Sequence, residues 1–411
     1  MGQAYANLGE DELAIQLMKQ AFDRRDRTSE REKFYITSHY YNIVSGDMPQ
    51  AIQTCELWAK AYPRNDTPVN NLAVAYSILG QHEKGLTEAQ EAVHREPNNA
   101  SNIANLGFAY LALNRLDEAR SIFEQGLAHT PDNLGARLGM YAIASLRGDT
   151  KAMEPQEAWA LGKPVAEGVF WVIEADTAAY HGKLATASEL FRRSVAADLR
   201  DNLRANAAAA KADASLWQAE YGYLEPGRQG AIAALAVTPN VPAKIMAALT
   251  FAEVKDASHA ETIAKELSQR FPNDTQLNNI WLPTIRAKVE ISRGNPAEAI
   301  KLLQTALPYD LGQNPPLPSL YPAYLRGQAY LRAQQTNSAA AEFQKILDHK
   351  SIVGNTPVAT LAHLGLARAR AMSGDTAAAR TAYQDFFALW KDADPDLPLL
   401  KQAKAEYEKL K

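Results

Sequence analysis

Cysteine is almost absent from this chain, since Cys55 is the only one among 411 residues. An intrachain disulfide is therefore excluded, and so is a structural zinc site built from paired cysteines. Long apolar runs are also absent, because no stretch reaches the roughly 20 residues that span a bilayer. The N-terminus has no basic segment followed by an apolar run. These absences predict a soluble, cytoplasmic chain with no membrane segment. An extracytoplasmic position stays open if an upstream transmembrane helix tethers it in a longer parent protein.

The chain has no excess of positive charge. Its 43 Lys and Arg residues stand against 47 Asp and Glu residues, which gives a formal net charge of −4. Binding to a phosphate backbone depends on clustered positive charge. The sequence therefore predicts that this chain binds no nucleic acid.

Catalytic motifs are missing as well. "GQHEKGLT" at 80–87 has the glycine spacing of a phosphate-binding loop, but Leu86 stands where the lysine is required. "DADPD" at 392–396 lacks the glycine and the closing glutamate of a calcium loop. We find no nucleophile elbow, no dinucleotide fingerprint and no protein-kinase signature. The sequence predicts a chain that is not an enzyme, with no catalytic residue, cofactor or metal, and with Cys55 as a buried, inert thiol.

An internal repeat is present instead. "NLAVAYSILGQHEKGLTEAQEAVHREPNN" at 71–99 aligns with "NLGFAYLALNRLDEARSIFEQGLAHTPDN" at 105–133 at an offset of 34 residues. This is the period of the tetratricopeptide helix–turn–helix unit. Small residues at matched positions allow close helix approach (Ala73 and Gly107 in the first helix, Gly85 and Ala119 in the second). Tyr76 and Tyr110 are expected to fill the space between hairpins, and Pro97 and Pro131 to end each second helix.

The same template extends along the whole chain and predicts about eleven hairpins followed by a capping helix at 397–411. No segment shows the alternation of a strand, so the fold class is all-α, a right-handed solenoid in which each hairpin packs on its neighbours. We divide it into a first block at 1–307, a Pro-rich loop at 308–322 that cannot be helical, and a second block at 323–411. Gly2 and Gly9 belong to a first repeat whose opening turn is missing, which leads us to expect a fragment of a longer protein.

A curved solenoid of this kind exposes a concave face lined by the first helix of each hairpin, where an extended peptide or a partner helix binds. The face is mixed apolar and aromatic, with Asn side chains available for peptide hydrogen bonds. Asn71 and Asn105 match positions that grip a C-terminal carboxylate in some repeats, but the basic partners are absent, so we predict no such clamp. The candidate peptide-binding residues are Lys33, Ile36, Tyr40, Asn70, Val74, Ser77, Ala104, Phe108, Leu111, Tyr321, Tyr324 and Gln328.

Several stretches are more specific than the generic repeat. They are "LNNIWLPTIRA" at 277–287, "LYPAYLRGQAYL" at 320–331 and "ALWKDADPDLPLLKQAKAEYEKL" at 388–410, with 31–65 upstream. Together they resemble the tetratricopeptide C-terminal regions of bacterial serine/threonine protein kinases of the acidobacterial type, over nearly the whole chain. The resemblance implies a non-catalytic scaffold that acts as the sensor or docking region of a kinase whose catalytic domain lies upstream. A stand-alone adaptor and the regulatory half of a winged-helix transcriptional regulator remain alternatives.

Overall fold

The structure is a computed structural model that describes residues 1–7 and 11–410. Gly9, which we assigned to the first repeat, and Lys411, the predicted end of the capping helix, lie outside the described residues. Within the described ranges the chain forms helices and turns and no strand. The predicted all-α fold class is therefore confirmed.

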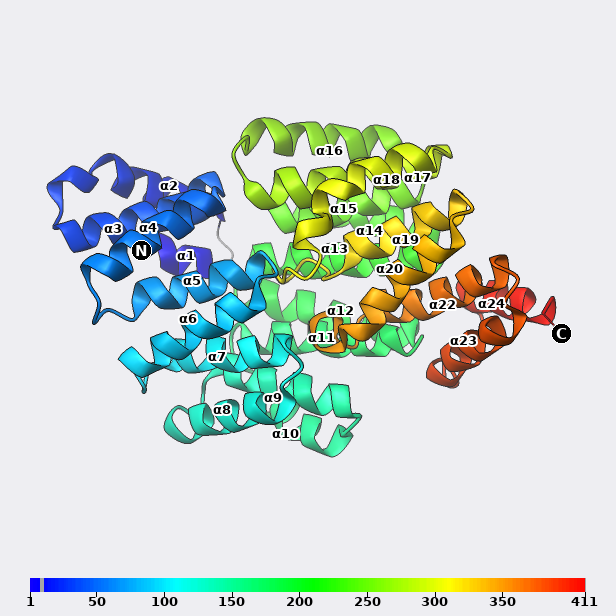
Figure 1. Cartoon of the computed structure of the whole chain (residues 1–411), viewed down its shortest axis with the longest axis horizontal. Helices are drawn as coiled ribbons and strands as arrows, with labels where there is room; N and C mark the ends of the chain where they lie inside the picture. The colour runs from blue at the N-terminus through cyan, green and yellow to red at the C-terminus, as the bar shows by residue number, and fades with distance from the viewer. Residues whose placement is uncertain (8–10, 411) are drawn as a thin grey trace. The chain divides into compact units, whose positions relative to one another are not determined.

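Eleven antiparallel helix pairs follow one another through the described residues (Figure 1). The pairs in the first part of the chain are α1 (Gly2–Asn7) with α2 (Asp11–Asp23), α3 (Glu30–His39) with α4 (Met48–Ala61), α5 (Thr67–Ile78) with α6 (His82–Arg95), α7 (Ala100–Ala112) with α8 (Leu116–His129), and α9 (Leu134–Arg147) with α10 (Thr150–Ala160). The later pairs are α11 (Ala166–Tyr180) with α12 (Leu184–Arg200), α13 (Arg204–Glu220) with α14 (Leu224–Val237), α15 (Val241–Glu253) with α16 (Ala257–Arg270), α17 (Leu282–Arg293) with α18 (Pro296–Leu303), α19 (Tyr321–Arg332) with α20 (Thr336–Asp348), and α22 (Pro357–Met372) with α23 (Thr376–Leu389).

Five smaller elements complete the described chain. They are the 3₁₀ helices η1 (Arg25–Arg27) and η4 (Gln304–Tyr309), the π-helical turns η2 (Tyr40–Ser45) and η3 (Leu277–Trp281), and the short helix α21 (Lys350–Val353). The capping helix α24 spans Pro398–Glu408, inside the predicted 397–411. Its side chains hold it to the hairpin before it, because Glu406 accepts hydrogen bonds from Arg368 (2.9 Å) and Tyr383 (2.9 Å).

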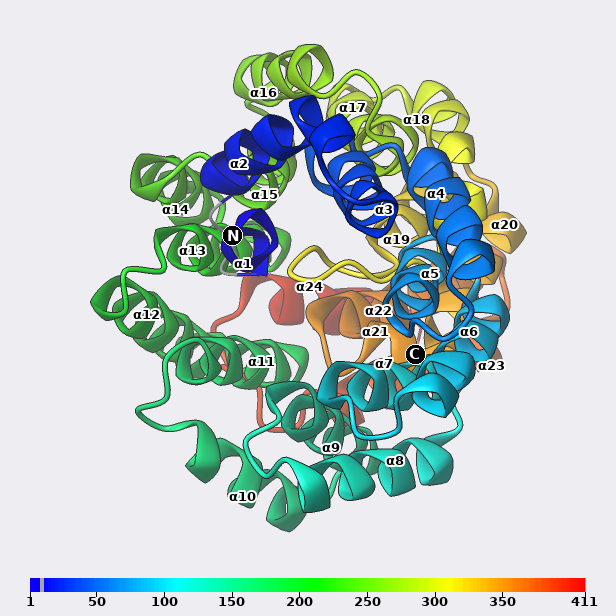
Figure 2. The same ribbon diagram turned by 90° about the vertical axis from the view of Figure 1, so that its left-hand side faces the viewer.

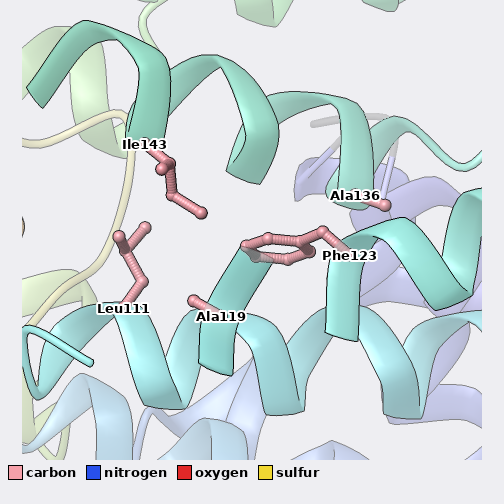
Figure 3. Close-up of a cluster of buried hydrophobic side chains, with 5 residues drawn as sticks. All are labelled: Leu111, Ala119, Phe123, Ala136 and Ile143. Carbon is pink, nitrogen blue, oxygen red and sulfur yellow. The ribbon is translucent and has the colours of Figure 1, made fainter. Parts of the chain in front are cut away.

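One packing rule recurs in the hairpins. A Cβ atom added to Gly107 or to Gly139 would come within 2.3 Å or 2.1 Å, respectively, of the Phe123 ring. The ring therefore lies against the glycines of two successive first helices. Figure 3 shows Phe123 among Leu111, Ala119, Ala136 and Ile143, all of them buried. These positions require glycine, because a larger residue would displace the aromatic ring.

The predicted repeat mechanics are also found at the other matched positions. The hydroxyl of Tyr76 donates to Glu56 Oε1 (3.3 Å) on the preceding second helix. The hydroxyl of Tyr110 also bonds the preceding second helix, where it accepts from Gln90 Nε2 (3.0 Å). Helices α6 and α8 end two residues before Pro97 and Pro131. Sequence pattern and structure agree here because the pattern encodes contacts between neighbouring hairpins.

The Pro-rich segment at 308–322 is less irregular than predicted. Pro308 and Tyr309 finish the 3₁₀ helix η4, and Tyr321 and Pro322 begin α19. The fixed φ of proline fits a 3₁₀ turn, and at the start of a helix its missing N–H costs no hydrogen bond. Our expectation that the whole segment is non-helical is therefore wrong at both ends. Its role as a boundary between blocks at 1–307 and 323–411 stays a proposal.

Backbone contacts group the chain into two compact units. The first unit comprises Met1–Leu161 with the short segments Phe271–Asn278 and Leu311–Gln313. The second unit comprises Gly162–Arg270, Asn279–Asp310 and Asn314–Lys411. In Figure 2, α11 to α16 of the second unit are stacked one hairpin after another.

The second unit closes on itself. Its late helix α22 packs against its earliest helix α11. The Tyr180 carbonyl at the end of α11 accepts hydrogen bonds from Thr360 Oγ1 (2.5 Å) and Trp390 Nε1 (3.0 Å). Next to it, the backbone N–H of Asp394 donates to the Gly182 carbonyl (3.0 Å). These bonds join the first and last hairpins of the unit, so its first helices enclose an interior.

Candidate functional site

The first unit carries a groove with a volume of about 640 Å³. Its walls come from α3 and η2, α4, α5, α7 and the start of α9, which are mainly the first helices of four successive hairpins. The side chains along it are mostly uncharged: His39, Asn42, Asn70, Asn71, Val74, Ile78, Ala104, Asn105, Phe108 and Asn133, with Asp132 at one end.

Two asparagines on neighbouring first helices are joined across this groove. Asn105 Nδ2 on α7 donates a hydrogen bond to Asn70 Oδ1 on α5 (2.9 Å). A carboxamide has two N–H donors and an oxygen acceptor. Within the described part of the chain, Asn70 Nδ2 and Asn105 Oδ1 make no hydrogen bond, which leaves one donor group and one acceptor at the groove.

The apolar part of the groove lies beside this amide pair. Val74 is 38% exposed, although it is on a helix whose neighbouring residues are buried. The ring of Phe108 is half-buried and meets Phe123 edge to face, with ring centroids 5.3 Å apart. Because Phe123 is held by glycines on both sides, Phe108 has a rigid support and presents its free face to the groove.

The side wall of the groove contains two groups that titrate in water. Cys55 is buried, and burial raises the pKa of its thiol to about 12, so the thiol stays protonated and unreactive. Burial lowers the pKa of His39, whose Nδ1 lies 2.8 Å from the Tyr35 carbonyl. The neutral imidazole and thiol keep this wall uncharged at pH 7. The expected burial of Cys55 is confirmed.

The structure brings four of the predicted binding residues together in this groove: Asn70, Val74, Ala104 and Phe108. The groove also includes residues that the sequence template did not select, namely Ser38, His39 and Asn42 from the first helix of the second hairpin. The template shifted that helix because η2 is a π-turn, which has wider spacing than the 3.6 residues per turn that we assumed.

The predicted residues of the second hairpin lie elsewhere. Lys33 forms an ion pair with Asp26 (2.5 Å) and borders a separate cavity beside Phe34 and Leu57. Tyr40 stacks on Phe22 with ring centroids 3.8 Å apart. Ile36 is half-buried and does not line the groove. Placing these side chains on the groove was therefore wrong, for the reason that the π-turn gives.

Two further predictions need correction in the same way. Leu111 is 5% exposed and belongs to the buried cluster around Phe123, so it is a core residue. Ser77 is half-buried outside the groove, and its carbonyl accepts a hydrogen bond from the Gln313 backbone N–H (3.3 Å). Neither residue lines the groove, although Ile78, next to Ser77, does.

Tyr321, Tyr324 and Gln328 do not lie on an open face. Tyr321 is fully buried and Tyr324 is 4% exposed, because closure of the second unit encloses its first helices. Both hydroxyls donate to Glu220, at 2.5 Å from Tyr321 and 3.1 Å from Tyr324. Gln328 Nε2 donates to the Tyr324 hydroxyl (3.1 Å) and borders a second cavity.

A buried ion pair occupies the centre of this network. Lys288 Nζ bonds Glu220, the Tyr321 hydroxyl (2.7 Å) and Glu253 Oε2 (2.9 Å). Burial alone would lower the pKa of Lys288, but the negative charges of Glu220 and Glu253 raise it above its usual value. Burial raises the pKa of Glu220, although the charge of Lys288 opposes the shift. No local sequence signal could have revealed this network, since its members are far apart in the chain.

Neither a metal-binding cluster nor a membrane-spanning helix is found among the described residues. No group of three or more His, Cys, Asp or Glu side chains among residues 1–7 and 11–410 is arranged to hold a metal ion. None of the helices described in the structure is long and apolar enough to cross a bilayer.

Two stretches of the chain match sequence models described as tetratricopeptide repeat, one over residues 78–142 and the other over 324–398. The first match runs from the end of α5 into α9 and so covers only the later helices of the groove, and the second covers the last hairpins of the second unit. The eleven hairpins of the described residues form an all-α helical-repeat fold, and these two stretches of it are tetratricopeptide repeats. The presence of these repeats supports the interpretation that the chain is a scaffold for protein–protein interaction.

Solved structures of similar proteins have low identity to this chain. Yeast Tom70 is 12% identical, with 100% of this chain and 94% of that one covered and a TM-score of 0.35. The tetratricopeptide domain of P58(IPK) is 14% identical, with 93% and 97% covered and a TM-score of 0.26. A tetratricopeptide repeat protein from Parabacteroides merdae is 15% identical, with 82% and 98% covered and a TM-score of 0.27.

Proposed function

We propose that the first unit binds an extended, largely uncharged peptide segment of a partner protein in the groove between α3 and α9. The amide pair of Asn70 and Asn105 carries the proposal, because it offers an unused donor group and an unused acceptor along the line that a bound backbone would follow. Val74 and Phe108 supply apolar contact for the peptide's side chains. The scaffold acts by binding, and its specificity comes from this groove.

The low charge of the groove decides the class of peptide. Among the described residues that line it, Asp132 is the only Asp, Glu, Lys or Arg, and its Oδ1 accepts a hydrogen bond from Trp159 Nε1 (2.9 Å). Desolvating a charged peptide side chain here would have no compensating ion pair. A neutral segment with small and apolar side chains therefore fits better than an acidic one.

Selection of peptides from a random library displayed on phage, with the full chain as bait, tests the proposal. For a selected peptide, the double variant Asn70→Ala/Asn105→Ala should weaken binding by about 30-fold, since each lost hydrogen bond is worth about 1 kcal/mol. Phe108→Ala should weaken binding as well. Dissociation constants measured by fluorescence polarisation would give both effects.

Asn337→Ala is the matched control, because Asn337 is an exposed asparagine on α20 that does not line the groove. It should leave affinity unchanged. Selected peptides that bind all these variants as tightly as the original chain would contradict the proposal.

We propose further that this scaffold is the docking or sensor region of a bacterial serine/threonine kinase. The support is the sequence resemblance of 31–65 and 277–410 to the repeat regions of such kinases. Sequencing the reading frame upstream tests it: a glycine-rich loop followed by His-Arg-Asp and Asp-Phe-Gly motifs is the expected result. A winged-helix domain there, or no further domain, would favour the transcriptional regulator or the stand-alone adaptor instead.

A further inference from the structure

The second unit contains its own cavity, with a volume of about 310 Å³, formed by α13, α15, α17, α19, α22 and α24. This volume is at the lower end of the range for small-molecule sites, so an extended peptide does not fit it. The cavity is separate from the groove of the first unit and shares no residue with it.

The floor of the cavity is charged and fully satisfied. Glu220, Lys288 and Tyr324 all line it, and each is less than 10% exposed. Lys288 Nζ uses its three protons on Glu220, Tyr321 and Glu253. A charged floor of this kind favours an occupant with polar groups, because ionic groups are more stable beside polar atoms than beside apolar ones.

The cavity also has one positive and one negative group with unused capacity. Arg332 donates through Nη1 to the Ile291 carbonyl (3.2 Å) and makes no other hydrogen bond or ion pair with the described residues. Glu253 contacts Lys288 through Oε2 and is 34% exposed, which leaves Oε1 available. Gln402 on α24 lines the same cavity and makes no hydrogen bond within the described part of the chain.

These two charged groups are both held by α17. Arg332 bonds the backbone carbonyl of Ile291, and Glu253 bonds the side chain of Lys288. Arg332 and Glu253 also line the same cavity, so its walls offer a small molecule one group of each charge. Leu325, Leu361 and Leu364, all buried, supply apolar lining to the same cavity and are called the leucine wall here.

We propose that this cavity binds a free α-amino acid with an apolar side chain. Its carboxylate would pair with Arg332 and accept from Gln402, its ammonium group would pair with Glu253, and its side chain would lie against the leucine wall. The site would make the second unit a receptor for a small zwitterion, independent of peptide binding by the first unit.

Thermal-shift screening of the full chain with the twenty standard L-amino acids, followed by isothermal titration calorimetry, tests this proposal. We expect leucine or a residue of similar size to bind. Its analogues 4-methylpentanoate, without the ammonium group, and 3-methylbutylamine, without the carboxylate, should each bind at least tenfold more weakly. Arg332→Gln and Glu253→Gln should each weaken amino-acid binding by at least tenfold.

Two further variants separate binding from folding. Gln402→Glu removes no contact within the described residues and places a negative charge beside the bound carboxylate, so it should weaken binding while the melting temperature stays the same. Arg286→Gln, which changes an exposed arginine of α17 outside the cavity, should leave binding unchanged. The proposal is overturned if no amino acid binds or if 4-methylpentanoate and 3-methylbutylamine bind as tightly as the amino acid. It is also overturned if Gln402→Glu leaves amino-acid affinity unchanged.

Discussion

The two units build different interiors from the same kind of hairpin. In the first unit, first helices from successive hairpins border an open groove whose surface is nearly uncharged. In the second unit, α22 returns to α11, and the corresponding surface surrounds an ion pair with hydroxyl and carboxylate partners. Five ion pairs among the described residues of the first unit each keep at least one exposed partner. Thus closure, and not the repeat itself, decides whether the first helices face a ligand or each other.

The packing between hairpins, by contrast, is shared. Phe343 of the second unit contacts Gly327 and Gly365, as Phe123 of the first unit contacts Gly107 and Gly139. An added Cβ would lie 2.7 Å from the Phe343 ring at Gly327 and 2.5 Å at Gly365. The repeat therefore determines how neighbours pack, while longer-range contacts determine what the inner surface does.

The largest expected effect comes from removing the buried cation of the closed unit. Lys288→Met leaves Glu220 charged and buried with only the tyrosine hydroxyls as partners, which should cost about 3–5 kcal/mol of unfolding free energy. Denaturant unfolding followed by tryptophan fluorescence would measure the loss. The difference between the units predicts that peptide binding by the first unit survives at low denaturant.

The control for this variant is Lys301→Met, since Lys301 is 77% exposed in its pair with Glu298. That change should stay within about 0.5 kcal/mol of the original chain. Adding Glu220→Gln to Lys288→Met should recover much of the stability. If the two lysine variants lose equal stability, the buried pair does not distinguish the units.

A second effect depends on pH and also belongs to the closed unit. Burial, with a smaller contribution from the charge of Asp201, raises the pKa of Asp198 on α12 to about 7. The folded state therefore keeps a proton that the unfolded state loses near pH 4. Stability should fall as pH rises from about 4 to 7 and stay level above that, by about 2–4 kcal/mol in total.

Asp198→Asn removes this titration. The variant should be less sensitive to pH between 4 and 7 and more stable than the original chain at pH 8, as measured by urea unfolding at both pH values. Asp201→Asn is the comparison, because Arg200 lowers the pKa of Asp201 through a hydrogen bond at the surface. A pH dependence unchanged by Asp198→Asn would show that other groups cause it.

The smallest of the three effects tests what the units share. Gly107→Ala and Gly327→Ala each force a methyl group against a phenylalanine ring and should each destabilise the chain by about 1–3 kcal/mol. Circular dichroism during thermal unfolding would measure both. Similar losses in the two units would support a common packing rule.

Gly85→Ala is the matched control, because its added Cβ would come no closer than 3.2 Å to any atom outside its own helix. The next repeat already has Ala119 at this position. Alanine also favours helix over glycine by about 1 kcal/mol, so this variant should be neutral or more stable. A large loss at Gly85 would contradict the rule.

The sequence predicted what neighbouring hairpins determine. The 34-residue offset located the small residues, the tyrosines and the helix-ending prolines, because these contacts recur at one spacing. It could not locate the π-turn at Tyr40–Ser45, which moved Lys33, Ile36 and Tyr40 off the groove. It also could not reveal that Tyr321 is enclosed, because closure joins residues such as Tyr180 and Trp390 that no repeat period connects. Four of the twelve predicted residues therefore lie in the groove, and the second cavity was not predicted.

The closing bonds at Tyr180 have a consequence for how the second unit folds. Open repeat arrays fold by adding one hairpin to the next, so that partly folded arrays are stable and the contacts remain local. Here Thr360 and Trp390 must reach a partner 180 and 210 residues earlier in the chain. Such remote contacts raise the entropic cost of closing the loop between their residues, and they slow folding. The second unit should thus form late and as a whole, and its inner cavity should exist only once the last hairpin has docked.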